Sequence, residues 1–462
     1  MMQPHALNTE IWHSRWQALQ AAIGDQLQLM RDNDDSVARQ TTLRSVLAGL
    51  RAFGKSQFEF FLAGFGPSAK VRLEPSTVYP AEYALRATID QIAYDLDMIQ
   101  HAAHQRLPAM ASQSMRDTLA LADRLAYQAL QPAMTANLLE PTTVVTYFQK
   151  AVNVRILPYA PVAFVGLPLS AVTTRRDLLA IPHEIGHYVY RHGRLRHGTA
   201  SGAPAGTRFD AAFTSALANQ PAWCVNWLEE IFADVYGAII GGPVMALGFE
   251  ELVTDDPVKE FIEDDGEHPV AALRPTLYHN VLRQRGGFER VTTLLEERWK
   301  QWQQQRGAPT SFKPADSNEE VSLEKGQATI NTVIQSMLET DLGKLNVPKP
   351  WSGEVAAPAD EEQLYTQYRK AVDELAADHT FRVPDLQMTN PGDKGTWMRL
   401  KTGDPHADGQ MTERKVGDTG LWIDAVKEAA ASGQSFNMPP AAWMALLDGS
   451  GWATEGPGSN AH

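Results

Sequence analysis

Residues 181–193 read Ile-Pro-His-Glu-Ile-Gly-His-Tyr-Val-Tyr-Arg-His-Gly, with His183, Glu184 and His187 near the centre of the stretch. On an α-helix, residues four apart lie on the same face. His183 and His187 can therefore offer two imidazole nitrogens to one tetrahedral metal ion. A carboxylate at Glu184 can take a proton from a zinc-bound water and pass it to a leaving amine. The stretch thus predicts a zinc-hydrolase helix with Glu184 as general base.

The sequence before this stretch predicts a strand, a turn and then a helix. Residues 162–168 are apolar and contain β-branched side chains, residues 170–174 are polar, and residues 175–182 have a helical pattern. Pro182 falls inside that pattern, and a proline in a helix interior removes a hydrogen bond and pushes on the preceding turn. We therefore expect a kink, or the start of a helix, just before His183.

A second helical pattern, over residues 223–237, contains the third metal ligand that we predict. Glu230 and Asp234 are four residues apart and so share one helix face. Glu230 would complete the metal site, and Asp234 would accept a hydrogen bond from the far nitrogen of a ligating histidine. Glu229 faces about a quarter-turn away and has no acidic partner four residues later. Glu230 is therefore the preferred ligand.

His-Glu-x-x-His followed by Glu-x-x-x-Asp on a second helix resembles the gluzincin group of metallopeptidases. Residues 264–274 read Asp-Asp-Gly-Glu-His-Pro-Val-Ala-Ala-Leu-Arg, so an arginine stands six residues after His268. This spacing is similar to that of the CAAX prenyl endopeptidases and their bacterial heat-shock relatives, in which the segment lies near the catalytic metal. The resemblance covers residues 162–274, about a quarter of the chain. Those relatives cross the membrane several times, whereas no segment here is expected to span one.

The resemblance implies an α+β fold, mostly α, with a zincin-like catalytic core, a small β-sheet and surrounding helices. It implies a zinc metallopeptidase acting on a peptide or protein substrate. By resemblance and position, the strand at residues 162–167 would line the cleft and pair with the extended substrate.

The segment that contains His268 and Arg274 is expected to face the metal and to stabilise the oxyanion that forms when water attacks a carbonyl. Pro269 would begin a helix, and Arg274 would lie further along it. Alternatively, Arg274 would pair with an acid of its own segment, Asp264, Asp265 or Glu267, and hold the segment in place.

Two other classes of function remain open. One is a zinc hydrolase that acts on a non-peptide amide. The other is a non-enzymatic interaction scaffold on a zincin fold. The scaffold is disfavoured because the general base, the three metal ligands and Asp234, which would bond to a ligating histidine, are all present. A purified protein that held no zinc would favour the scaffold.

Composition sets the broad class of the protein. The chain has 462 residues, of which 44% are hydrophobic and 21% charged, as in ordinary globular proteins. Its formal net charge of −14 argues against a general affinity for nucleic acid or anionic membrane. A single cysteine, Cys224, permits no intramolecular disulfide and is expected to be a buried packing residue. With no signal peptide and no membrane span expected, the predicted location is the cytoplasm.

Changes of pattern along the chain predict four regions. Residues 1–135 form an N-terminal helical region, and residues 136–305 the zincin-like core, whose sheet uses strands at 142–148, 152–157 and 162–167. Residues 306–378 form a linker and helices. Residues 379–462 form a loop-rich region that ends in a disordered tail. The tryptophans near the C-terminus would dock on the parent domain or hold an aromatic ligand: Trp351, Trp397, Trp422, Trp443 and Trp452. No pattern specifies an oligomeric state.

Overall fold

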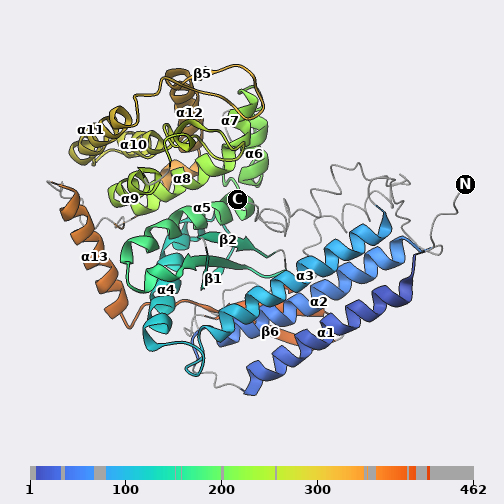
Figure 1. Cartoon of the computed structure of the whole chain (residues 1–462). Helices are drawn as coiled ribbons and strands as arrows, with labels where there is room; N and C mark the ends of the chain where they lie inside the picture. Colours follow the sequence, from blue (N-terminus) through green and yellow to red (C-terminus); the bar gives the residue numbers. More distant parts are fainter. Residues whose placement is uncertain are drawn as a thin grey trace, which may run out of the picture.

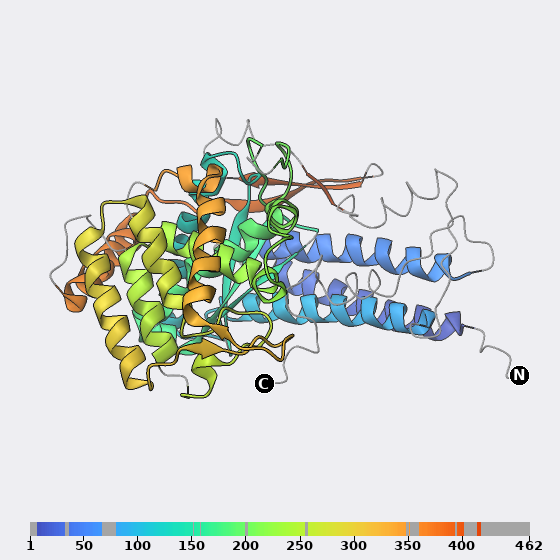
Figure 2. The same ribbon diagram turned by 90° about the horizontal axis from the view of Figure 1, so that it is seen from above.

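The computed structural model describes residues 7–32, 37–66, 80–150, 152–157, 159–198, 202–254, 257–347, 351, 360–392, 395–401 and 414–416. This part of the chain is mostly helical with small sheets, as the sequence predicts. Four long helices come first: α1 (Thr9–Asp32), α2 (Gln40–Gly64), α3 (Ala81–His104) and α4 (Gln113–Thr135). Helices α1 to α3 form one end of the molecule, while α10 to α12 lie at the opposite end, with α5 and α8 between them (Figures 1 and 2).

The sheet in the middle of the molecule consists of β1 (Thr143–Gln149), β2 (Asn153–Ile156) and β3 (Val162–Pro168) in the order β1-β3-β2. All three strands fall where the sequence predicts them. β3 pairs with β1 in parallel and with β2 in antiparallel fashion. Both edges of β3 are therefore occupied. The expectation that this strand pairs with an extended substrate is wrong, because its backbone groups already bond to two neighbours.

Each face of this sheet is covered by a different hydrophobic core. Val144, Phe148 and Val165 belong to a core that also contains apolar residues of α4, α5 and α8. Tyr147 and Phe164 belong to a second core that is shared with α1, α2 and α3. Since successive side chains of a strand point to opposite faces, a strand covered on both sides must be apolar throughout. This explains the nearly continuous apolar runs in this part of the sequence.

Two buried ion pairs fix the sheet to the helices on its faces. Arg106, which follows α3, forms a fork with Asp123 of α4 at 2.8 and 3.0 Å, and the same carboxylate accepts from the backbone N–H of Thr146 in β1. Arg155 of β2 donates to Asp95 of α3 at 2.7 and 3.0 Å. Removing one partner of such a pair would leave a buried charge uncompensated.

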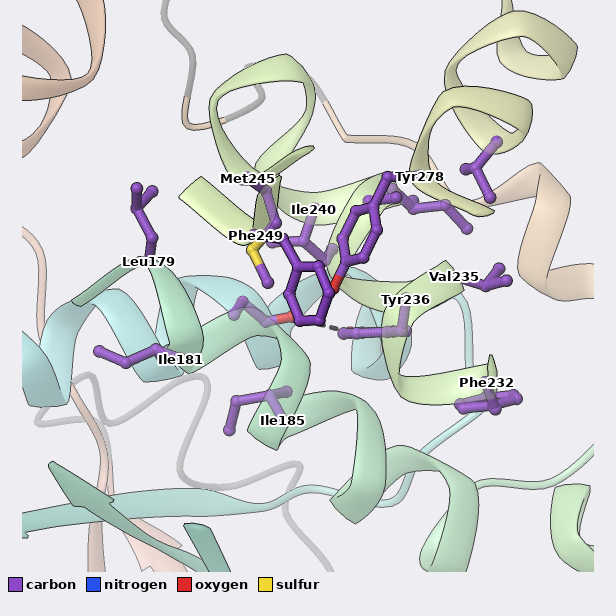
Figure 3. Packing of buried hydrophobic residues seen from close by; sticks show 14 of the residues in the cluster. Leu179, Ile181, Ile185, Phe232, Val235, Tyr236, Ile240, Met245, Phe249 and Tyr278 are labelled. Carbon is purple, nitrogen blue, oxygen red and sulfur yellow. Dashed lines mark hydrogen bonds between the residues drawn. The ribbon is translucent and has the colours of Figure 1, made fainter. Parts of the chain in front are cut away.

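The remaining helices follow β3 in the chain. They are η1 (Leu169–Val172), η2 (Arg175–Ala180), α5 (Ile181–His192), α6 (Phe209–Ala216), α7 (Ala222–Asn226), α8 (Leu228–Gly241), α9 (Pro243–Thr254), η3 (Glu260–Ile262), α10 (Arg274–Arg285), α11 (Glu289–Gln305), α12 (Leu323–Leu338), η4 (Asp341–Lys344) and α13 (Glu361–Ala377). Apolar side chains of α5, among them Ile181 and Ile185, lie close to Ile240 and Met245 of α8 and α9 (Figure 3). Cys224 is fully buried in this same core, as predicted.

The later part of the chain contains strands that the sequence does not predict. β4 (Ser311–Phe312) pairs with β5 (Val321–Ser322) inside residues 306–378, the region expected to hold a linker and helices. β6 (Asp385–Gly392), β7 (Gly395–Lys401) and β8 (Arg414–Val416) form an antiparallel sheet in the region expected to be loop-rich. That expectation is therefore wrong for the part of this region that the structure describes.

Side chains of α2 bind the first strand of this C-terminal sheet. Thr42 and Ser45 accept hydrogen bonds from the backbone N–H groups of Leu386 and Met388. Trp351 is buried and stacks on Tyr368 of α13, so this tryptophan docks on the body of the molecule. Trp422, Trp443, Trp452 and the tail at 455–462 lie outside the described residues.

In the part of the chain that the structure describes, no helix combines the length and the apolar character needed to cross a membrane.

Candidate metal centre

Helix α5 begins just before the paired histidines. Pro182 stands in its first turn, where the missing N–H of a proline costs nothing because that group has no partner in the helix. The prediction of a helix start at this point is confirmed. His183 and His187 project from one face of the helix, with ring centroids 4.7 Å apart.

Helix α8 carries the acidic ligand candidate and crosses α5 at close range. The helical pattern predicted for residues 223–237 is divided at Trp227 into a short α7 and the longer α8. A Cβ placed on Gly186 of α5 would lie 2.7 Å from Cα and 2.9 Å from the carbonyl oxygen of Ala233 in α8. Only glycine permits this approach, and the approach brings the acidic face of α8 to the histidines of α5.

Three side chains converge where the two helices cross. His183 Nε2 lies 3.1 Å from His187 Nε2 and 3.4 Å from Glu230 Oε2, and His187 Nε2 lies 3.3 Å from Glu230 Oε1. With bonds of ~2.0–2.1 Å, two ligands of a tetrahedral ion of zinc's size lie roughly 3.3–3.4 Å apart. His183, His187 and Glu230 could therefore hold a metal ion.

The charges around these three residues favour a cation. Burial alone would lower the pKa of His183, but the nearby carboxylates of Asp234 and Glu230 outweigh burial and raise this pKa to about 10. Burial would raise the pKa of Glu230, yet His187 and Arg274 hold it well below its ordinary value. Glu230 is thus an ionised carboxylate beside His183, whose surroundings favour a positive charge.

Asp234 lies directly behind one of the histidines. Its Oδ1 is 2.8 Å from His183 Nδ1, and the residue is fully buried. Arg274 donates to both Asp234 oxygens, at 2.7 and 3.1 Å, and the hydroxyl of Tyr278 donates to Oδ1 at 2.7 Å. A carboxylate held in this way can fix the tautomer and the orientation of the imidazole.

Glu229 also contacts a histidine, which the sequence does not predict. Its Oε1 lies 3.3 Å from His187 Nδ1, on the side of the ring opposite Glu230. Arg191 donates to both oxygens of Glu229, with the Nε to Oε1 bond at 3.0 Å. The sequence shows that Arg191 follows His187 by four residues and shares its helix face, but it does not show that Glu229 of another helix meets this face.

The segment at 264–274 approaches the same place, but its conformation differs from the one predicted. No helix begins at Pro269; the chain makes turns, and α10 begins only at Arg274. Arg274 donates to Glu230 Oε2 at 2.6 Å as well as to Asp234. The suggested pairing of Arg274 with an acid of its own segment is therefore wrong, because two carboxylates of α8 bind its guanidinium group.

His268 stands at the exposed side of the site. Its side chain is 42% exposed, and its Nε2 lies 3.4 Å from Glu230 Oε1. Asp265 binds its Nδ1 at 2.7 Å and accepts from its backbone N–H at 2.7 Å. Burial would lower the pKa of His268, but the hydrogen bond to Asp265 and the charge of Glu230 raise it. An imidazole in this position can donate a hydrogen bond toward the space beside Glu230.

Glu184 follows His183 in α5 and is nearly buried, with 8% of its surface exposed. Glu184 lies between two residues that face the interior. His183 contacts Glu230 of α8, and Ile185 belongs to the hydrophobic core. Glu184 thus lies within one helical turn of both histidines.

Comparison of the chain with protein-family models, with curated proteins and with solved structures finds no match to any of them.

Proposed function

We propose that this protein is a zinc-dependent metallopeptidase of the gluzincin type. The observation that carries the proposal is the convergence of His183, His187 and Glu230, whose donor atoms lie at separations suited to a tetrahedral ion. Two imidazoles and one carboxylate leave one position of such an ion for water or substrate. This donor set is typical of catalytic zinc sites, whereas structural zinc sites use four protein ligands.

Each neighbouring side chain has a distinct task in this proposal. When bound, the zinc ion polarises a carbonyl group and makes water more acidic. Glu184 accepts the proton of the attacking water and later delivers it to the departing amine. Asp234 and Arg274 are positioning residues, since Asp234 contacts His183 and Arg274 holds both Asp234 and Glu230.

His268 is the group we propose for the oxyanion. Its Nε2 lies beside Glu230 at the exposed side of the site, and Asp265 favours the protonated ring. A donor placed where negative charge develops stabilises the transition state more than the bound substrate. Arg274 is less suited to this task than the sequence suggests, because its Nε and one terminal nitrogen already bind carboxylates.

The experiment that tests the proposal is metal analysis of the purified protein, combined with digestion of a peptide library. We expect one zinc per chain, new peptide termini with the untreated protein, loss of cleavage with chelator, and its return with Zn²⁺. Glu184→Gln should bind zinc and leave the library intact.

The same experiment separates the alternatives. Zinc binding without cleavage of any peptide would favour a hydrolase of non-peptide amides, and a panel of acylated amines would then be the next substrates. A purified protein that neither contains nor takes up zinc would favour a non-enzymatic scaffold.

A further inference from the structure

The two histidines of the site are each backed by a carboxylate that an arginine holds. His183 is backed by Asp234, which binds Arg274. His187 is backed by Glu229, which binds Arg191. The pair of Asp234 and Arg274 lies beside α10, and the pair of Glu229 and Arg191 lies at the C-terminal end of α5. The pattern repeats: both carboxylates belong to α8, and only the arginines come from different helices, α10 and α5.

The contact at His187 decides which nitrogen faces the metal. A neutral imidazole binds a metal through one nitrogen only if the other carries the proton. Glu229 Oε1 lies 3.3 Å from His187 Nδ1, and an ionised carboxylate in this place favours a proton on Nδ1. His187 Nε2 is then left as the donor, on the side of Glu230.

Arg191 holds Glu229 in this orientation. Its guanidinium group binds both carboxylate oxygens in a planar fork, which fixes the plane as well as the position of the carboxylate. Arg191 and His187 belong to the same face of α5, and Glu229 directly precedes the ligand Glu230 in α8. The pair therefore links the two helices beside the metal site.

The two supports differ in exposure. Asp234 is 0% and Arg274 12% exposed at the side chain, while Glu229 is 19% and Arg191 25% exposed. The contact of Glu229 to its histidine is also longer, at 3.3 Å against 2.8 Å. Replacing Glu229 is thus expected to disturb the fold less than replacing Asp234, which makes its effect on the metal easier to measure.

We propose that Glu229 is a positioning residue for His187 and that Arg191 acts through it. This inference rests on the proposed metal site, and it adds a role for two residues that touch neither substrate nor metal. Removing such a carboxylate typically lowers metal affinity by about 10–100-fold. Glu229→Leu should show a loss in this range, and Glu229→Gln, whose amide oxygen still accepts from Nδ1, should show a smaller one.

The test is the affinity of the full chain for Zn²⁺ alone, measured by competition with a chelator of known affinity. The matched control is Glu296→Leu, because Arg283 of α10 binds Glu296 of α11 in the same kind of fork, at 3.1 and 2.6 Å. This control removes the same charge and the same type of ion pair, and it should leave zinc affinity unchanged.

Two further measurements separate positioning from folding. Thermal unfolding of the metal-free proteins should show no larger loss for Glu229→Leu than for Glu296→Leu. With Co²⁺ in place of zinc, the visible absorption bands should shift for Glu229→Leu and for Arg191→Met but not for the control. If Glu229→Leu does not fold, Glu229→Gln and Arg191→Met test the same contact. The double variant Arg191→Met with Glu229→Leu should bind zinc no more weakly than Glu229→Leu alone.

The outcomes distinguish this inference from the proposed function. Wild-type zinc affinity and unchanged Co²⁺ bands in the folded Glu229 variants would overturn the role of Glu229 and leave the peptidase proposal standing. A wild-type protein that binds neither ion would overturn both.

Discussion

Glu184 carries the proton transfer in the proposed reaction and makes no bond to the metal in this account. Glu184→Gln should therefore retain zinc at the wild-type level while peptide hydrolysis falls by ~10²–10⁴-fold, the usual loss on removing a general base. Metal analysis and single-turnover cleavage measure the two quantities on one preparation. A variant that kept more than about a third of the wild-type rate would show that another group activates the water.

His268 tests the oxyanion assignment. His268→Ala should lower kcat by roughly 10²–10³-fold with KM and zinc content little changed, because the contact forms mainly in the transition state. Steady-state kinetics on a single cleaved peptide would measure this. An increase in KM at constant kcat would instead make His268 a substrate-binding residue.

Helix periodicity is enough to predict which side chains of the site share a helix face. The spacing of His183 and His187, and of Glu230 and Asp234, places each pair on one face wherever the helix lies. Which faces meet depends on the crossing of α5 and α8, and a single sequence does not specify that crossing. For this reason the sequence does not predict the contact of Glu229 with His187: Glu230 is preferred because Glu229 has no acidic partner four residues later.

At the scale of elements, the crossing of α5 and α8 depends on Gly186. A Cβ there would meet backbone atoms of Ala233, which cannot rotate away as a side chain can. Gly186→Ala should destabilise the protein by ~1–3 kcal/mol, as overpacking does, and should weaken metal binding by separating the histidines from Glu230. Urea unfolding and chelator competition are the measurements.

Gly24→Ala is the control for this substitution. Gly24 lies inside α1, and a Cβ there would meet nothing within 4 Å. This change should stabilise the protein by ~0.5–1 kcal/mol, because alanine has the higher helix propensity, and leave metal affinity unchanged. Equal stability and metal affinity in Gly186→Ala and the wild type would show that the crossing of α5 and α8 does not require a glycine at this position.

The segment that carries His268 should respond to acid through Asp265. Burial would raise the pKa of Asp265, but hydrogen bonds from the side chain and backbone of His268 and from the backbone of Glu267 lower it to about 2. A carboxyl whose pKa is lower in the folded protein stabilises it above the unfolded pKa of about 3.9, and this stabilisation is lost as the pH falls toward 2.

Unfolding midpoints of the wild type and Asp265→Asn, compared from pH 6 to pH 3, measure this effect. The wild type should be more stable at pH 6, and the difference should shrink below about pH 4. A difference that stays constant over the range would mean that Asp265 stabilises the segment by something other than its charge.

Strand positions could be predicted at this scale, but strand order could not. β-branched and aromatic residues indicate where β1, β2 and β3 lie. β3 lies between the other two strands. β1 and β2 are held to different helices by buried contacts between residues far apart in the sequence, Thr146 with Asp123 of α4 and Arg155 with Asp95 of α3. The expected pairing of β3 with a substrate is wrong because β1 and β2 occupy both edges of this strand.

At the scale of the whole molecule, the site lies where α5 and α8 cross, between the helical bundle of α1 to α3 and the helices α10 to α12 (Figure 1). One buried core extends from α4 through the site to α13. The strands after residue 384 escaped prediction because their Gly, Asp and Pro residues resemble loops. The first of them, β6, is held to the distant helix α2 by hydrogen bonds to Thr42 and Ser45.

Zinc-dependent peptide hydrolysis is tested by measuring the rate of hydrolysis as metal-free protein is titrated with Zn²⁺. A peptide cleaved in the library experiment serves as substrate, and Glu230→Ala, which should lose the metal, serves as the control. The rate should rise in proportion to bound zinc and reach a plateau at one ion per chain. A hydrolysis rate that stays the same while zinc binds stoichiometrically would contradict a zinc-dependent reaction.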